Sequence, residues 1–93
     1  MMTPDQAETV ALRALAWMAA DEEMASRFGG ATGASLGEAR DHLADPGYLS
    51  GILEFLVLED RWVQAFCDAE RLPYDTPLRA LAALPGGRRE EWP

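Results

Sequence analysis

The sequence predicts an all-α fold, a compact bundle of five to six short helices around a central hydrophobic helix at about residues 46–58. Apolar residues recur at steps of three and four along most of the chain, whereas no stretch shows the period of two that a half-buried strand requires. Residues that cap helices stand before the apolar stretches. At 93 residues we expect one helical domain, residues 1–87, with a mobile C-terminal tail, residues 88–93.

The first expected helix runs from Pro4 to Ala19. Thr3 and Gln6 have the spacing of a capping box, and proline suits the first helical position. The residues that recur at helical spacing form one apolar stripe, which predicts that this helix lies on the core: Ala7, Val10, Ala11, Ala14, Trp17 and Met18.

Two shorter helices are expected next. Asp21 can cap the first of them, which we expect to end at Gly29 and Gly30 because glycine readily adopts the left-handed conformation of a helix end. Ser35 and Glu38 form a second capping box and open the other, which ends near Ala44. Their inward-facing residues are expected to be Met24 and Phe28, and Leu36, Ala39 and Leu43.

The central hydrophobic helix follows Asp45 and Pro46, a capping residue and a proline suited to the first turn. Its apolar residues cover about 200° of a helical wheel, so the other helices should pack around it: Tyr48, Leu49, Ile52, Leu53, Phe55, Leu56 and Val57. A narrow stripe is left that the core does not obviously use, and Leu58 within it is expected to be exposed. We take this stripe as the candidate partner-binding surface: Ser50, Gly51, Glu54 and Leu58.

A turn at Glu59 separates the next helix, because the two apolar stripes do not join in phase. Asp60 is expected to cap it. The expected buried residues are Trp62, Val63, Phe66 and Ala69, and those on the opposite side are Arg61, Gln64, Asp68 and Arg71.

The last expected helix opens at Thr76-Pro77 and ends at Pro85-Gly86-Gly87. Proline in its first turn and the proline and glycines after it mark the two ends. We expect its leucines to face inward and Arg79 to face outward. The leucines are Leu78, Leu81 and Leu84.

Composition excludes several kinds of partner. The net charge is −8, and all eight basic residues are arginine, so the surface should repel nucleic acid and anionic membranes. Cys67 is the only cysteine, which excludes an intrachain disulfide and suits a reducing compartment. No run approaches the roughly 18 apolar residues of a membrane span. We therefore expect a cytoplasmic location.

No pattern of residues predicts a catalytic, cofactor-binding or metal site. His42 and Cys67 are each single, whereas metal and thiol sites combine several ligands or a nucleophile with a base. The acidic residues at Asp21 and Glu59 lie where helices begin, so capping explains them. The glycines after Phe28 match no phosphate-binding pattern. We expect a protein without enzymatic activity or cofactor.

Several stretches together resemble a known family. They read ETVALRALAWMA, DEEM followed by FGGATG, DPGYLSGILEFLVLED, AFCDA and ALPGG, and they extend from the first helix to Gly87. In this order they resemble the bacterial family named domain of unknown function 3572, found mostly in alphaproteobacteria. The resemblance implies a stand-alone, intracellular helical protein, and it carries no catalytic residue or cofactor over to this chain.

The functional hypothesis is a non-enzymatic protein-interaction or regulatory module of the bacterial cytoplasm, whose partner is another protein or a second copy of the chain. One alternative is a helix-turn-helix protein with Arg61, Gln64 and Arg71 facing DNA, although Asp68 lies on the same face. The other is a small ligand-binding or enzymatic helical protein with an internal pocket.

Overall fold

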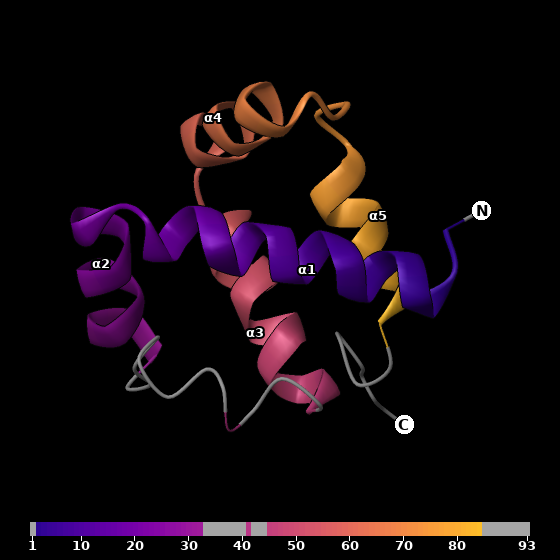
Figure 1. Cartoon of the computed structure of the whole chain (residues 1–93), viewed down its shortest axis with the longest axis horizontal. Helices are drawn as coiled ribbons and strands as arrows, with labels where there is room; N and C mark the ends of the chain where they lie inside the picture. Colours follow the sequence, from indigo (N-terminus) through magenta and orange to yellow (C-terminus); the bar gives the residue numbers. More distant parts are fainter. Residues whose placement is uncertain (1, 33–40, 42–44, 85–93) are drawn as a thin grey trace.

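Five helices make up the described part of the computed structural model, which comprises residues 2–32, 41 and 45–84 (Figure 1). They are α1 (Pro4–Ala19), α2 (Glu22–Thr32), α3 (Pro46–Leu56), α4 (Asp60–Glu70) and α5 (Thr76–Ala83). Within these ranges there is no strand, and the all-α prediction is confirmed. The helix expected after Ser35 and the tail at 88–93 lie outside the described residues, except for Asp41 in a short 3₁₀ turn.

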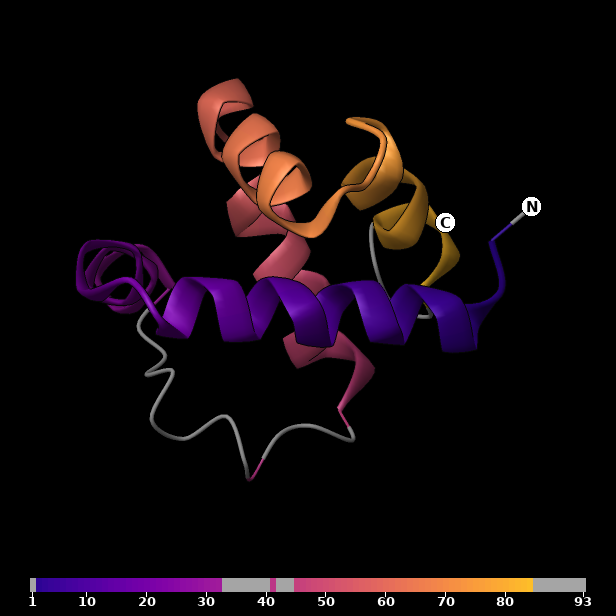
Figure 2. The same cartoon turned by 45° about the horizontal axis from the view of Figure 1, so that its top comes forward.

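The core forms where α1 crosses α3. Both helices also pack against α5, and α2 packs against α1. In Figures 1 and 2, α2 lies at one end of α1, α5 lies nearer the other end, and α4 follows the C-terminal end of α3. The central helix carries five buried apolar side chains, the same number as α1, and all five are large: Leu49, Ile52, Leu53, Phe55 and Leu56.

The first helix begins as the sequence predicts. The Gln6 backbone N–H donates to Thr3 Oγ1 at 3.1 Å, and the Thr3 N–H donates to Gln6 Oε1 at 2.9 Å, which closes the capping box. Small side chains dominate the buried face, so neighbouring helices can approach closely. The buried residues of α1 are Ala7, Val10, Ala11, Ala14 and Met18, and Trp17 is half-buried.

The second helix does not end at its glycines. Asp21 does cap it, since its carboxylate accepts from the backbone N–H groups of Glu23 and Met24. However, α2 continues through Gly29 and Gly30 to Thr32. Glycine permits a left-handed helix end but does not impose one, and its cost inside a helix is only about 1 kcal/mol relative to alanine.

The turn between α3 and α4 lies where the sequence predicts it, with a different capping residue. The N-cap is Glu59, whose side chain makes no capping hydrogen bond, and Asp60 is the first residue of α4. An acidic residue in the first turn still interacts favourably with the helix dipole. The prediction that Asp60 caps α4 was therefore wrong, whereas the predicted break between the two helices is confirmed.

The buried face of α4 also differs in part. Phe66 and Cys67 are fully buried, whereas Ala69 is exposed and Trp62 and Val63 are half-buried. The buried face of α4 is therefore centred on Phe66 and Cys67, and Ala69 lies outside it.

The link from α4 to α5 is held by local contacts. Arg71 adopts the left-handed conformation, with φ 60° and ψ 48°, and the Leu72 N–H donates to the Cys67 carbonyl at 2.9 Å. This is the hydrogen bond of a Schellman helix end. From α1, Arg13 donates through Nε to Glu70 Oε1 at 2.8 Å and through Nη2 to the Glu70 carbonyl at 3.1 Å. The end of α4 is thereby tied to α1.

One leucine of α5 points the other way from the prediction. Leu81 and Leu84 are buried and Arg79 is exposed, as expected, but 58% of Leu78 is exposed. The inward face of the helix is instead completed by Thr76, Pro77 and Ala80. This leaves a large apolar side chain on the surface.

Candidate functional site

The stripe predicted on the central helix is only partly on the surface. Ser50 is buried, with 3% of the residue exposed, so the expectation that it lies outside the core was wrong. Among the described residues, its hydroxyl has no hydrogen-bond partner. Gly51 is half-buried, while Glu54 and Leu58 are exposed. As a surface for a partner, the stripe therefore stays a prediction for Glu54 and Leu58.

Two of the most exposed large apolar side chains lie at one pocket. In the described part of the chain the large apolar residues that are most exposed are Leu12, Leu58, Tyr74 and Leu78, with 41%, 69%, 51% and 58% exposed. Of these, Tyr74 and Leu78 line an open pocket of about 190 Å³. We call this surface the Leu78 groove, made of Val57, Asp60, Val63, Gln64, Tyr74 and Leu78.

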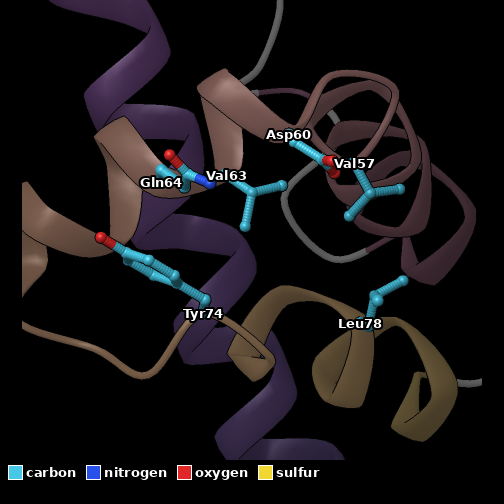
Figure 3. Close-up of a pocket in the computed structure, with 6 residues that line it drawn as sticks. All are labelled: Val57, Asp60, Val63, Gln64, Tyr74 and Leu78. Carbon is cyan, nitrogen blue, oxygen red and sulfur yellow. The ribbon is translucent and has the colours of Figure 1, made fainter.

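Three elements and the link before α5 build the Leu78 groove (Figure 3). Val57 lies just after α3, Val63 belongs to α4, and Leu78 belongs to α5. The phenol of Tyr74 donates to Asp68 Oδ1 at 2.7 Å, which fixes the ring at the edge of the pocket. The groove is therefore a consequence of how α3, α4 and α5 meet.

Acidic side chains run along one side of the groove. Asp60 and Gln64 line it, and Asp68 follows on the same face of α4, since residues four apart in a helix are neighbours. Asp60 and Asp68 are eight residues apart, about 12 Å along the helix. Within the described ranges neither carboxylate forms an ion pair with an arginine. An apolar floor with uncompensated negative charge beside it is the chemistry of this surface.

The two groups near the groove with shifted pKa values are both held protonated. Burial raises the pKa of the Cys67 thiol above its usual 9.0, and the charges of Asp68 and Asp75 raise it further. The hydrogen bond to Asp68 raises the pKa of the Tyr74 phenol above its usual 10.0. Since the thiolate is the nucleophilic form of cysteine, Cys67 is a core residue with little nucleophilic character.

A second pocket, of about 330 Å³, lies between α1, α2 and α4. Two half-buried indoles line it: Trp62 stacks on Phe55, with ring centres 5.0 Å apart, and Trp17 meets Phe66 edge to face. Its charges are largely satisfied, because Glu23 accepts two hydrogen bonds from Arg27. The remaining lining residues are Asp21, Met24, Arg61 and Ala65, and Arg61 lies 3.6 Å from Glu59.

The described residues contain neither a metal-binding cluster nor a membrane-spanning helix. No group of three or more His, Cys, Asp or Glu side chains there is arranged so that it could hold a metal ion. None of the helices described is both long enough and apolar enough to span a lipid bilayer. His42 lies outside the described residues.

Sequence reasoning missed most of the Leu78 groove. Gln64 was expected on the surface and is exposed, but Val57, Val63 and Leu78 were assigned to the core. Tyr74 carried a usable signal, because it is an aromatic residue between Pro73 and Asp75 in a segment without helical periodicity. An aromatic residue in such a link is often exposed.

Comparison with known proteins gave one match. The model of the family described as "Protein of unknown function (DUF3572)" matches residues 4–87, nearly the whole chain, which confirms the resemblance seen in the sequence. Neither the curated proteins nor the solved structures contain a significant match.

Proposed function

This chain belongs to the DUF3572 family of unknown function, and from its geometry we propose that it is a non-enzymatic protein-interaction module of the bacterial cytoplasm that holds a protein partner in the Leu78 groove. One observation carries the proposal: Tyr74 and Leu78, two of the four most exposed large apolar side chains in the described residues, line one pocket together with Val57 and Val63. Clustered apolar exposure is typical of interaction surfaces, whereas single exposed apolar residues are ordinary.

The size of the groove favours a side chain of a partner over a small molecule. Pockets for small ligands usually hold about 300–1,000 Å³, more than the 190 Å³ found here. The protonated groups nearby, Cys67 and Tyr74, supply no base or nucleophile at neutral pH. These features support binding without chemistry.

Charge supports the choice of partner class. The exposed side of α4 that could be presented to DNA carries Asp68 beside Arg61, Gln64 and Arg71, and Asp60 lies at its start. The two carboxylates on this side repel the phosphate backbone. A protein surface imposes no such penalty, since its charges can be of either sign.

The test is site-specific photo-crosslinking in the organism that encodes the chain. A photoreactive residue replaces Leu78 in one strain and Leu12 in the other, because Leu12 is also exposed but does not line the groove. A defined partner peptide joined at position 78 and absent at position 12 supports the proposal. The same products at both positions, or none at 78, would refute it.

A ligand-binding function is the second candidate, favoured by the pocket between α1, α2 and α4. Its volume of about 330 Å³ falls within the range of small-ligand sites, and Trp17, Trp62 and Arg61 could bind an aromatic carboxylate by stacking and ion pairing. A panel of aromatic carboxylates should quench the indole fluorescence and raise the melting temperature. Loss of both responses in Arg61→Ala would identify the pocket, and no response to any compound would exclude this class.

A further inference from the structure

We propose that the occupant of the Leu78 groove is a basic amphipathic helix of another protein, with apolar side chains that enter the pocket and Lys or Arg side chains that pair with Asp60 and Asp68. This inference rests on the proposed function and specifies the partner. It combines the apolar floor of the groove with the charge along its α4 side.

The apolar floor of the groove favours a helical partner. Peptides that bind in extended form usually add a strand to a sheet edge, and the described residues contain no sheet. A helix instead inserts residues spaced three or four apart into an apolar groove. Val63 of α4, Leu78 of α5 and Val57, which directly follows α3, line such a floor together (Figure 3).

The carboxylates along α4 favour a partner with positive charge. Asp60 and Asp68 lie on one face of α4, about 12 Å apart along its axis, and among the described residues no arginine neutralises either of them. The basic residue nearest to Asp60 in sequence, Arg61, lies instead 3.6 Å from Glu59. Two positive side chains about two turns apart on a partner helix would match this spacing.

A second copy of the chain is a poorer occupant. Each copy carries a net charge of −8 and contains no lysine, so two acidic grooves brought together would repel. The Asp60 and Asp68 carboxylates would also lose water without gaining a positive partner, which is costly at an interface. A basic partner gains from the same charges.

The test uses a fluorescent peptide of about 15 residues, long enough for four helical turns, with leucines on one face and two flanking lysines two turns apart. A second peptide has the same leucines and glutamates in place of the lysines. Binding is measured by fluorescence anisotropy against the full chain. We expect the basic peptide to bind, the acidic peptide to bind at least about tenfold more weakly, and affinity to fall as salt rises from about 50 mM to about 500 mM.

Matched variants separate the groove from general attraction to an acidic protein. The double variant Asp60→Asn with Asp68→Asn should lower the affinity for the basic peptide about tenfold. The double variant Asp5→Asn with Glu22→Gln removes the same amount of charge elsewhere and should leave that affinity unchanged. Asparagine at position 68 can still accept from the Tyr74 hydroxyl. Leu78→Ala should weaken binding, and Leu12→Ala should not. Melting curves confirm that each variant is folded.

Exchange of charge gives the decisive result. With Asp60→Lys and Asp68→Lys, the preference should reverse and the acidic peptide should bind better. Equal binding of both peptides to the original chain, an equal loss in the two charge-neutralising doubles, or a crosslink from position 78 to a second copy would overturn the inference. A crosslink at position 78 to a non-basic segment would overturn it as well and would leave the proposed function intact.

Discussion

The two leucines of α5 at positions 78 and 81 provide a sharp test of the structure. They are three residues apart on one helix, yet 58% of Leu78 and only 5% of Leu81 is exposed. Truncation of a buried leucine to alanine costs about 2–5 kcal/mol, the sum of lost transfer energy and the cavity left behind. Substitutions at exposed positions usually change the free energy of unfolding by less than about 0.5 kcal/mol. Leu81→Ala should therefore destabilise strongly and Leu78→Ala hardly at all.

The assay is thermal unfolding followed by circular dichroism and by tryptophan fluorescence. For a chain of this length 1 kcal/mol corresponds to about 4–8 °C in melting temperature, so Leu81→Ala should lower it by about 8 °C or more and Leu78→Ala by at most about 4 °C. Leu56→Ala, at a fully buried position of α3, should match Leu81→Ala. Equal losses at 78 and 81 would mean that the face assigned to α5 is wrong.

Three further predictions concern the end of α4. Cys67 is fully buried and its thiol pKa is raised, so a disulfide reagent at about pH 8 should label it slowly in the native state and rapidly in urea; fast native labelling would contradict its burial. The phenol of Tyr74 should titrate above pH 10.0, and Asp68→Asn should lower that midpoint in phenolate absorbance. Because the folded-state pKa is raised, this stabilisation is present below pH 10.0 and is lost as pH rises through the folded-state value. Arg71→Gly should raise the free energy of unfolding by about 0.5–1 kcal/mol, since glycine tolerates the left-handed conformation, whereas a gain of the same size from Arg71→Ala would rule out that explanation.

The ends of the helices were predictable where a local signal decides them. The capping box at Thr3 depends on residues three apart, and it forms as the sequence predicts. Asp45 likewise caps α3, accepting from the Gly47 N–H at 2.9 Å. Glu59 shows the limit, because two adjacent acidic residues both satisfy the pattern and the sequence does not choose between them.

The buried faces were predictable only near their centres. Ser50 lies about 60° from Leu53 on a helical wheel, at the edge of the apolar stripe, and there the neighbouring helices decide whether it is covered. In α5, three leucines suggested one inward face, but Pro77 and Ala80 are buried instead of Leu78. A short helix has two or three compatible faces, and its neighbours select one.

The Leu78 groove was not predictable from any single stretch. Its residues come from the end of α3, from α4, from the link and from α5. These segments come together because of the turn at Glu59 and the left-handed conformation of Arg71. Arginine is not a residue type that predicts a left-handed conformation, so the sequence does not indicate this turn. Tertiary packing thus creates the site, and no contributing segment has a sequence pattern that predicts a groove.

The net charge also affects how an exposed apolar groove is tolerated. Exposed apolar side chains in one groove of a small protein would favour self-association, and repulsion between copies with a net charge of −8 opposes it. The same repulsion does not act on every partner. A protein with positive charge beside its apolar residues is attracted to the groove, whereas a second copy of the chain is repelled. In the binding mode that we propose, the groove and the charge act together as a surface that selects a partner by the sign of its charge.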